Sequence, residues 1–198
     1  MESVSRKLRS DEDWEKEIKL FWEAMDRIFT VQKNTTCGSH VHVAPIGRPY
    51  TLEEVKRIAF ACCIYEPYVV SLLPTDRRDH PYCKRNSNVA TRMGMLYRQQ
   101  TPTALKMIAN DIKEKTNRRD VCKYMQNGLN HSDRAVLWNF QNLVNSTRES
   151  HSPSGTIEFR GGRHLRGPKR TLRWITFAVV FISMAIHEVR FLAVLNCT

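Results

Sequence analysis

Residues 155–160 have the sequence Gly-Thr-Ile-Glu-Phe-Arg, which gives the clearest local indication of a strand in the chain. Apolar Ile157 and Phe159 alternate with charged Glu158 and Arg160, and this period of two predicts a β-strand with one apolar and one charged face. On the charged face the carboxylate and the guanidinium would lie side by side. Such a pair is either an ion pair worth about 0.2–1 kcal/mol, or a site for a cation and an anionic group.

A second alternating segment lies earlier in the chain. Residues 37–43, Cys-Gly-Ser-His-Val-His-Val, place Val41 and Val43 on one side of a predicted strand and His40 and His42 on the other. Two imidazoles on one face can bind a metal ion, donate to phosphate oxygens or polarise a carbonyl. Two solvated histidines would explain the pattern equally well.

Helical spacing of apolar residues predicts the elements around these strands, which together indicate an α+β or α/β domain. Residues 11–29 form a predicted helix capped by Ser10, and Thr51 with Glu54 forms a capping box that opens a helix ending near residue 66. We also expect a helical turn or strand at 68–73, a helix at 104–115, and a strand end at Gly161 and Gly162 that precedes a helix from 168 to about 195. Residues 116–133 are polar and indicate no defined element, and the apolar run 135–144 fits a strand or a helix, with the strand favoured.

A basic loop follows the second helix. Residues 74–83 are Pro-Thr-Asp-Arg-Arg-Asp-His-Pro-Tyr-Cys. The adjacent Arg77 and Arg78 can clamp phosphate charge. An exposed basic loop, with Asp76 and Asp79 as local ion partners, is the alternative.

The overall charge favours anionic partners. The chain carries 31 Lys+Arg against 20 Asp+Glu, a net charge of +11, which suits nucleotides, acidic peptides, nucleic acid or acidic membrane surfaces.

None of the six cysteines lies in a Cys-x-x-Cys pair, so a structural zinc site has little support. Cys62 and Cys63 lie in an apolar run, as small buried side chains do. The charged N-terminal segment has no apolar signal region, and we expect a reducing, intracellular, cytoplasmic location.

One apolar segment near the end of the chain resembles part of a membrane-spanning helix. Residues 174–186 are almost wholly apolar, but 13 residues fall short of the roughly 20 that cross a bilayer. We therefore expect a buried core helix. Membrane association through residues 172–195 is the least favoured of the functional hypotheses.

Taken together, residues 36–43, 74–83 and 155–160 resemble the putative amidoligase family in composition and order. The resemblance extends over most of residues 36–190. It implies a partial glutamine-synthetase-like catalytic domain of the α+β class, with helices packed on an antiparallel sheet. In this scheme residues 1–35 are a charged N-terminal helix and residues 36–198 are the amidoligase-like domain.

The resemblance implies an ATP-dependent ligase that joins a carboxylate to an amine through an acyl-phosphate. ATP and Mg²⁺ would be the cofactors, and the substrates would be a small-molecule or peptide amine and carboxylate. The site residues that it implies are Glu158 and His40 for the metal, His40, His42 and Arg78 for the nucleotide, and Arg160, Arg78 and Arg77 for catalysis.

The sequence departs from the family pattern at its beginning. The family normally starts with a strand of alternating acidic metal ligands, whereas Glu12, Glu15 and Glu17 here fit a solvated helix face. A truncated product, a degenerate relative that still binds a ligand, and a site completed by a second subunit of a homo-oligomer all fit this pattern. The competing function is a noncatalytic basic module that binds nucleic acid or another polyanion.

Overall fold

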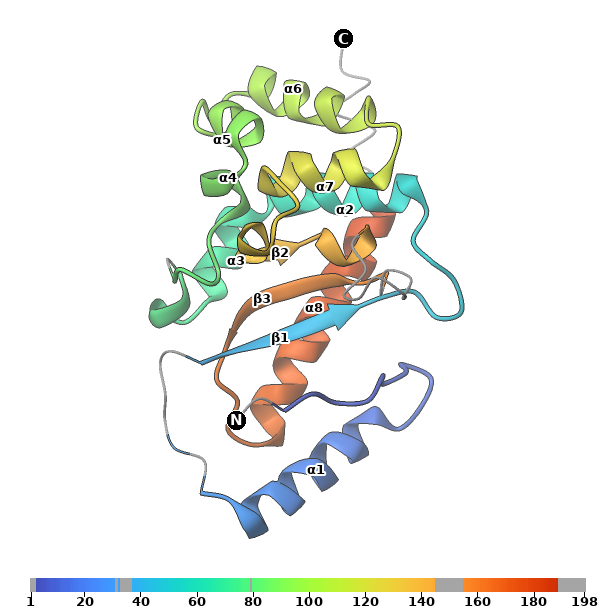
Figure 1. The fold of residues 1–198 in the computed structure, drawn as a ribbon, viewed down its shortest axis with the longest axis vertical. Helices are drawn as coiled ribbons and strands as arrows, with labels where there is room; N and C mark the ends of the chain where they lie inside the picture. Colours follow the sequence, from blue (N-terminus) through green and yellow to red (C-terminus); the bar gives the residue numbers. More distant parts are fainter. Residues whose placement is uncertain (1–2, 31, 33–36, 79, 145–154, 189–198) are drawn as a thin grey trace.

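The computed structural model describes residues 3–30, 32, 37–78, 80–144 and 155–188. Within these ranges the fold is α+β, with helices around a three-stranded antiparallel sheet of order β1-β3-β2 (Figure 1), and this confirms the predicted class. The elements are α1 Trp14–Ile28, β1 Gly38–Val43, α2 Leu52–Ile64, α3 Glu66–Leu72, η1 Thr75–Arg77, α4 Asn86–Val89, α5 Thr91–Tyr97, α6 Pro102–Lys113, α7 Arg118–Gln126, η2 His131–Arg134, β2 Trp138–Asn139, η3 Gln141–Leu143, β3 Ile157–Arg163 and α8 Pro168–His187.

The two strands predicted from alternation are β1 and β3, and they pair with each other. In their register His42 lies opposite Glu158 and Val41 lies opposite Phe159, and the register shifts between Ser39 and Val41. Because the side chains of paired residues share a face, this register places the histidines of β1 beside the charged side chains of β3.

Gly161 and Gly162 do not end β3, which continues to Arg163. Their role is close packing. A Cβ on Gly161 would lie 2.5 Å from the Phe159 ring and 2.7 Å from Leu73, and a Cβ on Gly162 would collide with Ser39 of β1. The glycines therefore let the strand pass through a crowded region that a side chain would obstruct.

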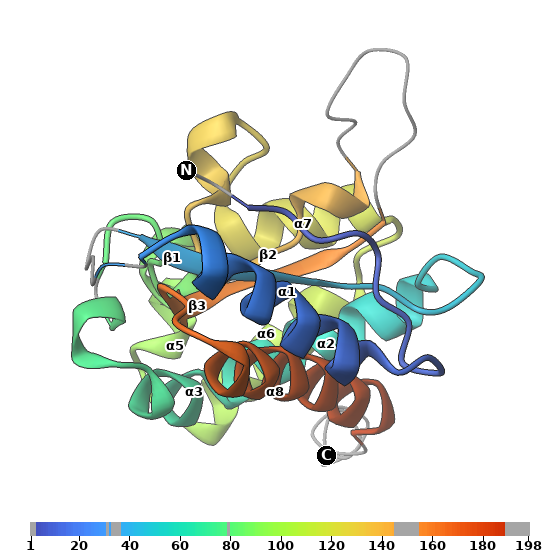
Figure 2. The same cartoon turned by 90° about the horizontal axis from the view of Figure 1, so that it is seen from below.

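Helix α8 crosses the apolar face of the sheet, on one side of the molecule in Figure 2. Phe159 of β3 has its ring centroid 5.2 Å from Phe177 and 5.5 Å from Trp174 of α8. The expectation of a buried core helix is confirmed by the four side chains Ala178, Phe181, Ile182 and Ala185, which are buried.

The other end of the predicted final helix, from residue 189 to 195, lies outside the described residues. Among those that are described, no helix combines the length and apolar character that crossing a membrane requires.

Helix α1 packs against α8 through a buried polar contact. Trp22 Nε1 donates to Thr171 Oγ1 over 2.8 Å. The predicted start was too early, because Asp13 and not Ser10 caps the helix, its carboxylate accepting from the backbone N–H of Lys16. Hence residues 11–13 remain outside the first turn.

Several expectations for the middle of the chain need correction. Residues 116–133, for which the sequence indicated no defined element, contain helix α7. Of the two alternatives expected for 68–73, the helical one is correct, because residues 68–72 belong to helix α3. The segment 135–144 contains only the two-residue strand β2 and the turn η3. Cys62 and Cys63 are buried, as predicted.

The predicted capping box at the start of α2 is confirmed. Thr51 Oγ1 accepts from Glu54 N over 3.2 Å, and Glu54 Oε2 accepts from Thr51 N over 2.8 Å.

We expect Thr51→Ala to lower the free energy of unfolding by about 1 kcal/mol, because it leaves a helix N–H unsatisfied. Urea denaturation measures this. Thr103→Ala, an exposed change inside α6, is the control and should stay within about 0.5 kcal/mol. Equal effects would contradict the capping role.

Candidate active site

Glu158 is the centre of a polar cluster on the charged face of β3. Its side chain is only 5% exposed. Oε1 accepts from Arg160 Nη1 over 2.7 Å, and Oε2 accepts from Asn139 Nδ2 of β2, also over 2.7 Å. Gln141 N donates to Asn139 Oδ1 over 2.9 Å, which turns the amide so that its nitrogen faces the carboxylate. The ion pair expected from the Glu-x-Arg spacing is therefore present, and it is buried.

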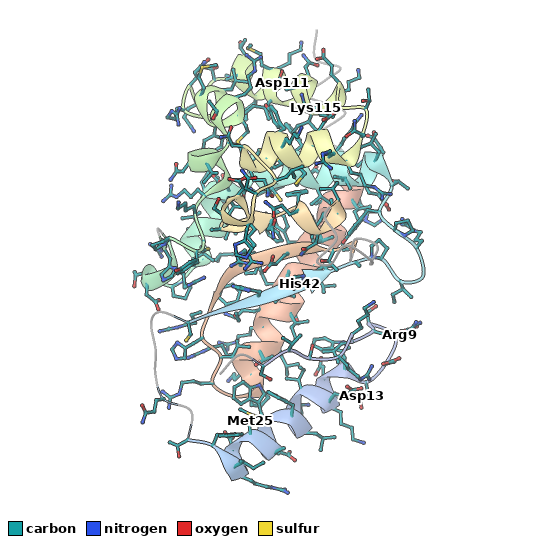
Figure 3. All side chains as sticks on the ribbon, in the orientation of Figure 1. Arg9, Asp13, Met25, His42, Asp111 and Lys115 are labelled. Carbon is teal, nitrogen blue, oxygen red and sulfur yellow. The ribbon has the colours of Figure 1, made fainter. Side chains whose placement is uncertain are left out.

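Both histidines of β1 reach the same carboxylate oxygen. Glu158 Oε1 lies 3.3 Å from His40 Nδ1 and 3.6 Å from His42 Nε2. His42, labelled on β1 in Figure 3, has its Nδ1 3.1 Å from Thr156 Oγ1 and 3.2 Å from Asn142 Nδ2. The prediction that the two imidazoles share one face is confirmed, and the half-exposed ring of His42 leaves this side of the cluster accessible to solvent.

The two arginines of the basic loop have different surroundings. Arg77 is 1% exposed, and its Nη2 donates to the Arg160 carbonyl over 2.8 Å. A Cβ on Gly38 would lie 2.6 Å from that nitrogen, so a glycine there leaves room for the guanidinium. Arg78 instead donates to the carbonyls of Leu73 and Ser71, each over 3.0 Å. Arg77 thus supports the strand that carries Glu158, whereas these two hydrogen bonds of Arg78 hold it at the end of α3.

Burial, and secondarily the charge of Arg160, lower the pKa of His40 to about 4, although Glu158 acts in the opposite direction. His40 is therefore a neutral imidazole near pH 7. A neutral imidazole has one N–H donor and one lone pair, so His40 can bind a phosphate or carboxyl oxygen but is a weak base at that pH.

The lowered pKa of His40 predicts a pH-dependent stability. Between pH 6.5 and about 4 the unfolded chain binds a proton at His40 that the folded chain does not, so the free energy of unfolding should fall as pH falls through this window. Urea denaturation at pH 7, 5.5 and 4.5 measures the fall. His40→Asn should make it smaller, and a wild-type slope retained in that variant would contradict the assignment.

The ligands that the cluster offers can be compared with those of the Mg²⁺ ion that the family resemblance implies. Magnesium takes oxygen ligands, commonly one or two carboxylates with waters and phosphates. Both oxygens of Glu158 accept from nitrogen donors, and the described residues place no group of three or more His, Cys, Asp or Glu side chains for a metal ion. As arranged, the cluster does not fit a resident Mg²⁺, and the metal roles of Glu158 and His40 stay predictions.

Three contacts of the cluster were missed in the sequence. Asn139, Asn142 and Thr156 hold the carboxylate or His42. The signal for Asn139 was a polar residue inside the apolar run 135–144, where a buried amide requires a partner. No local pattern indicated that the partner would be Glu158.

The family model described as "putative amidoligase enzyme" matches residues 1–182. No curated protein and no solved structure matches the chain, so the likeness to the glutamine synthetase fold stays a prediction. The family match covers α1 and all three strands with their histidine, glutamate and arginine cluster, and the chain belongs to the putative amidoligase enzyme family.

Proposed function

We propose that this amidoligase is an ATP-dependent carboxylate–amine ligase whose reaction takes place on the face shared by β1 and β3. The observation that supports this most directly is the convergence of Arg160, His40 and His42 on one oxygen of Glu158, within 2.7 to 3.6 Å. Donors that gather around one carboxylate can also bind the carboxylate or phosphate oxygens of a ligand.

The proposed reaction has two steps. An oxygen of the substrate carboxylate forms a bond to the γ-phosphorus of ATP, and ADP leaves. The amine nitrogen then bonds to the carbonyl carbon of the acyl-phosphate, phosphate leaves, and the amine releases a proton to solvent. Both steps move negative charge between oxygens, so fixed cations and N–H donors assist them.

Arg160 has the chemistry to bind these oxygens. Its planar guanidinium suits carboxylate and phosphate geometry, and it is held by Glu158 and by the Tyr82 carbonyl, which accepts from Nε over 3.3 Å. His40, neutral near pH 7, supplies an uncharged N–H donor. His42 is the more exposed imidazole and would meet the ligand first. Arg78 enters the proposal only as an exposed cation that follows Arg77 in the loop.

Magnesium enters this proposal as part of the Mg–ATP substrate. The β- and γ-phosphates supply the oxygen ligands that the ion prefers. Glu158 is negatively charged and faces the proposed phosphate position, so free ATP would be repelled and the metal complex would be preferred.

The first test is equilibrium binding of ATP with and without Mg²⁺, using wild type and Glu158→Gln. In wild type we expect Mg²⁺ to tighten binding by about 10-fold or more, because it screens the repulsion between Glu158 and the phosphates. In Glu158→Gln the two affinities should approach each other. Glu23→Gln, an exposed change on α1, is the matched control and should behave as wild type.

Absence of ATP binding by folded wild-type protein would contradict the proposal. The competing function, a polyanion-binding module, would then be supported by nucleic-acid binding that weakens steeply with salt and shows no dependence on Glu158. The net charge of +11 is the observation that motivates it.

A further inference from the structure

The start of helix α8 carries a charge arrangement that a helix N-terminus normally avoids. This 20-residue helix has Gly167 as its N-cap, without a side-chain cap, and no acidic residue in its first turn. Lys169 and Arg170 are there instead. The N-terminal end of a helix is partially positive and favours anions, so added cations concentrate positive charge at one place.

His164, in the loop between β3 and α8, is a buried side chain without polar partners. The residue is 7% exposed, and within the described residues neither Nδ1 nor Nε2 has a hydrogen-bond partner. Its own backbone carbonyl accepts from Arg170 Nη1 over 3.4 Å, which ties the loop to the first turn of α8. Buried ring nitrogens are ordinarily hydrogen-bonded. The His164 ring lacks such a partner, and a bound ligand could provide one.

The charges facing His164 come from four elements. Burial is the main cause that lowers its pKa, followed by Arg163 of β3, Arg170 of α8 and Arg166 of the loop, while Asp76 of η1 raises it. Asp76 Oδ2 lies 4.0 Å from Arg163 Nη2, and Arg163 Nε is buried without a partner in the described part of the chain. Three guanidinium groups and one carboxylate thus act on the charge of the His164 ring, and Arg163 is the one of the three that lies near Asp76.

We propose that His164, Arg163, Arg166 and Arg170 form, with the N-terminus of α8, a binding site for a compact oxyanion of the phosphate or sulfate type. The anion would accept from the ring of His164, from the arginines and from the free backbone N–H groups of the first helical turn. The side chain of Arg166 is exposed, so an anion in solvent can contact it directly. The anion also favours protonation of His164, because a protonated ring donates from both nitrogens.

This site is separate from the Glu158 cluster and goes beyond the proposed ligase function. Arg163 lies five residues beyond Glu158 along β3, which corresponds to about 16 Å of extended strand. The oxyanion is either a free ion or the phosphate group of an ester such as a nucleotide, and the chemistry of recognition is the same for both.

The test is a calorimetric titration of the full chain with sulfate, whose charge is constant between pH 5.5 and 7.5. Wild type should bind saturably, and an Arg166→Ala, Arg170→Ala double variant should bind about 10-fold more weakly or worse, since two charged donors are lost. Arg27→Ala, an exposed arginine of the last turn of α1, is the control and should stay within about two-fold.

The pH arm tests the role of the histidine. Sulfate affinity should be about 10-fold higher at pH 5.5 than at pH 7.5 in wild type, through uptake of a proton by His164. His164→Gln should bind with little pH dependence. If that variant does not fold, the double arginine variant, measured at both pH values, still tests the site.

Two further arms separate the ligand sources and the two proposed sites. Competition of ATP with sulfate in the Glu158→Gln variant would identify a phosphate ester as the ligand, and lack of competition would identify a free oxyanion. Glu158→Gln itself should bind sulfate as wild type does, even if it fails in the ATP experiment. Absence of saturable sulfate binding, or equal weakening by Arg27→Ala, would overturn the proposal.

Discussion

Replacing Trp138 by alanine is expected to lower the free energy of unfolding by about 3–5 kcal/mol, the largest stability effect of any single change that we consider. Trp138 is 0% exposed. Its ring centroid lies 4.6 Å from that of Phe181 of α8, in a stacked arrangement, and 4.9 Å from that of Phe159 of β3. Alanine would leave a cavity where the sheet meets the helix, and urea denaturation monitored by circular dichroism measures the loss.

Two comparison variants locate the cause of that loss. The indole Nε1 has no hydrogen-bond partner in the described residues, so Trp138→Phe keeps an aromatic ring and removes an unsatisfied donor. We expect it to cost less than half as much as alanine. Tyr68→Ala, which removes a 70% exposed ring from α3, should change stability by about 0.5 kcal/mol or less. Equal costs for Phe and Ala at position 138 would show that the indole makes a polar contact which packing does not explain.

The same aromatic cluster shows why part of the fold could be predicted from the sequence. In β3 the alternation of apolar and charged residues determines which side chains face α8. A strand has a period of two, so the apolar side chains all lie on the face that packs against this helix. In β1 the same rule placed His40 and His42 together. The capping box at Thr51 was predictable because its bonds join residues three apart in the sequence.

Elements without such local rules were missed. Helix α7, Arg118–Gln126, is rich in charged and polar residues, and its burial of Val121, Cys122 and Met125 depends on contacts with α2, α4 and α5. Strand β2 has only two residues, so its apolar run carries no usable period. In both cases tertiary packing outweighs the local preference.

The candidate site divides in the same way. The ion pair of Glu158 and Arg160 follows from their spacing on one strand. The contribution of Asn139, and the burial of Arg77 beneath the Arg160 carbonyl, depend on segments that are distant in the sequence. The sequence of two adjacent arginines does not indicate which one is buried. In the structure Arg77 is buried and Arg78 is exposed.

Arg160→Lys is expected to weaken binding of Mg–ATP by about 10- to 100-fold, corresponding to roughly 1.5–3 kcal/mol for a lost charge-assisted hydrogen bond. Lysine keeps the positive charge and so keeps Glu158 compensated, which avoids the larger penalty of an unpaired buried carboxylate. It loses the planar fork that can hold Glu158 and a ligand oxygen together. Equilibrium binding by fluorescence or calorimetry measures the effect, with circular dichroism to show that the variant is folded.

The matched control for this change is Arg92→Lys. Arg92 of α5 also pairs with a carboxylate, donating to Asp111 over 3.0 and 3.3 Å, but its side chain is 52% exposed. The same chemical replacement there should leave ATP affinity unchanged. If Arg160→Lys also bound Mg–ATP like wild type, the guanidinium would not contact the nucleotide. Arg160 would then serve to hold Glu158 in place, and the phosphate position proposed for this face would have to be abandoned.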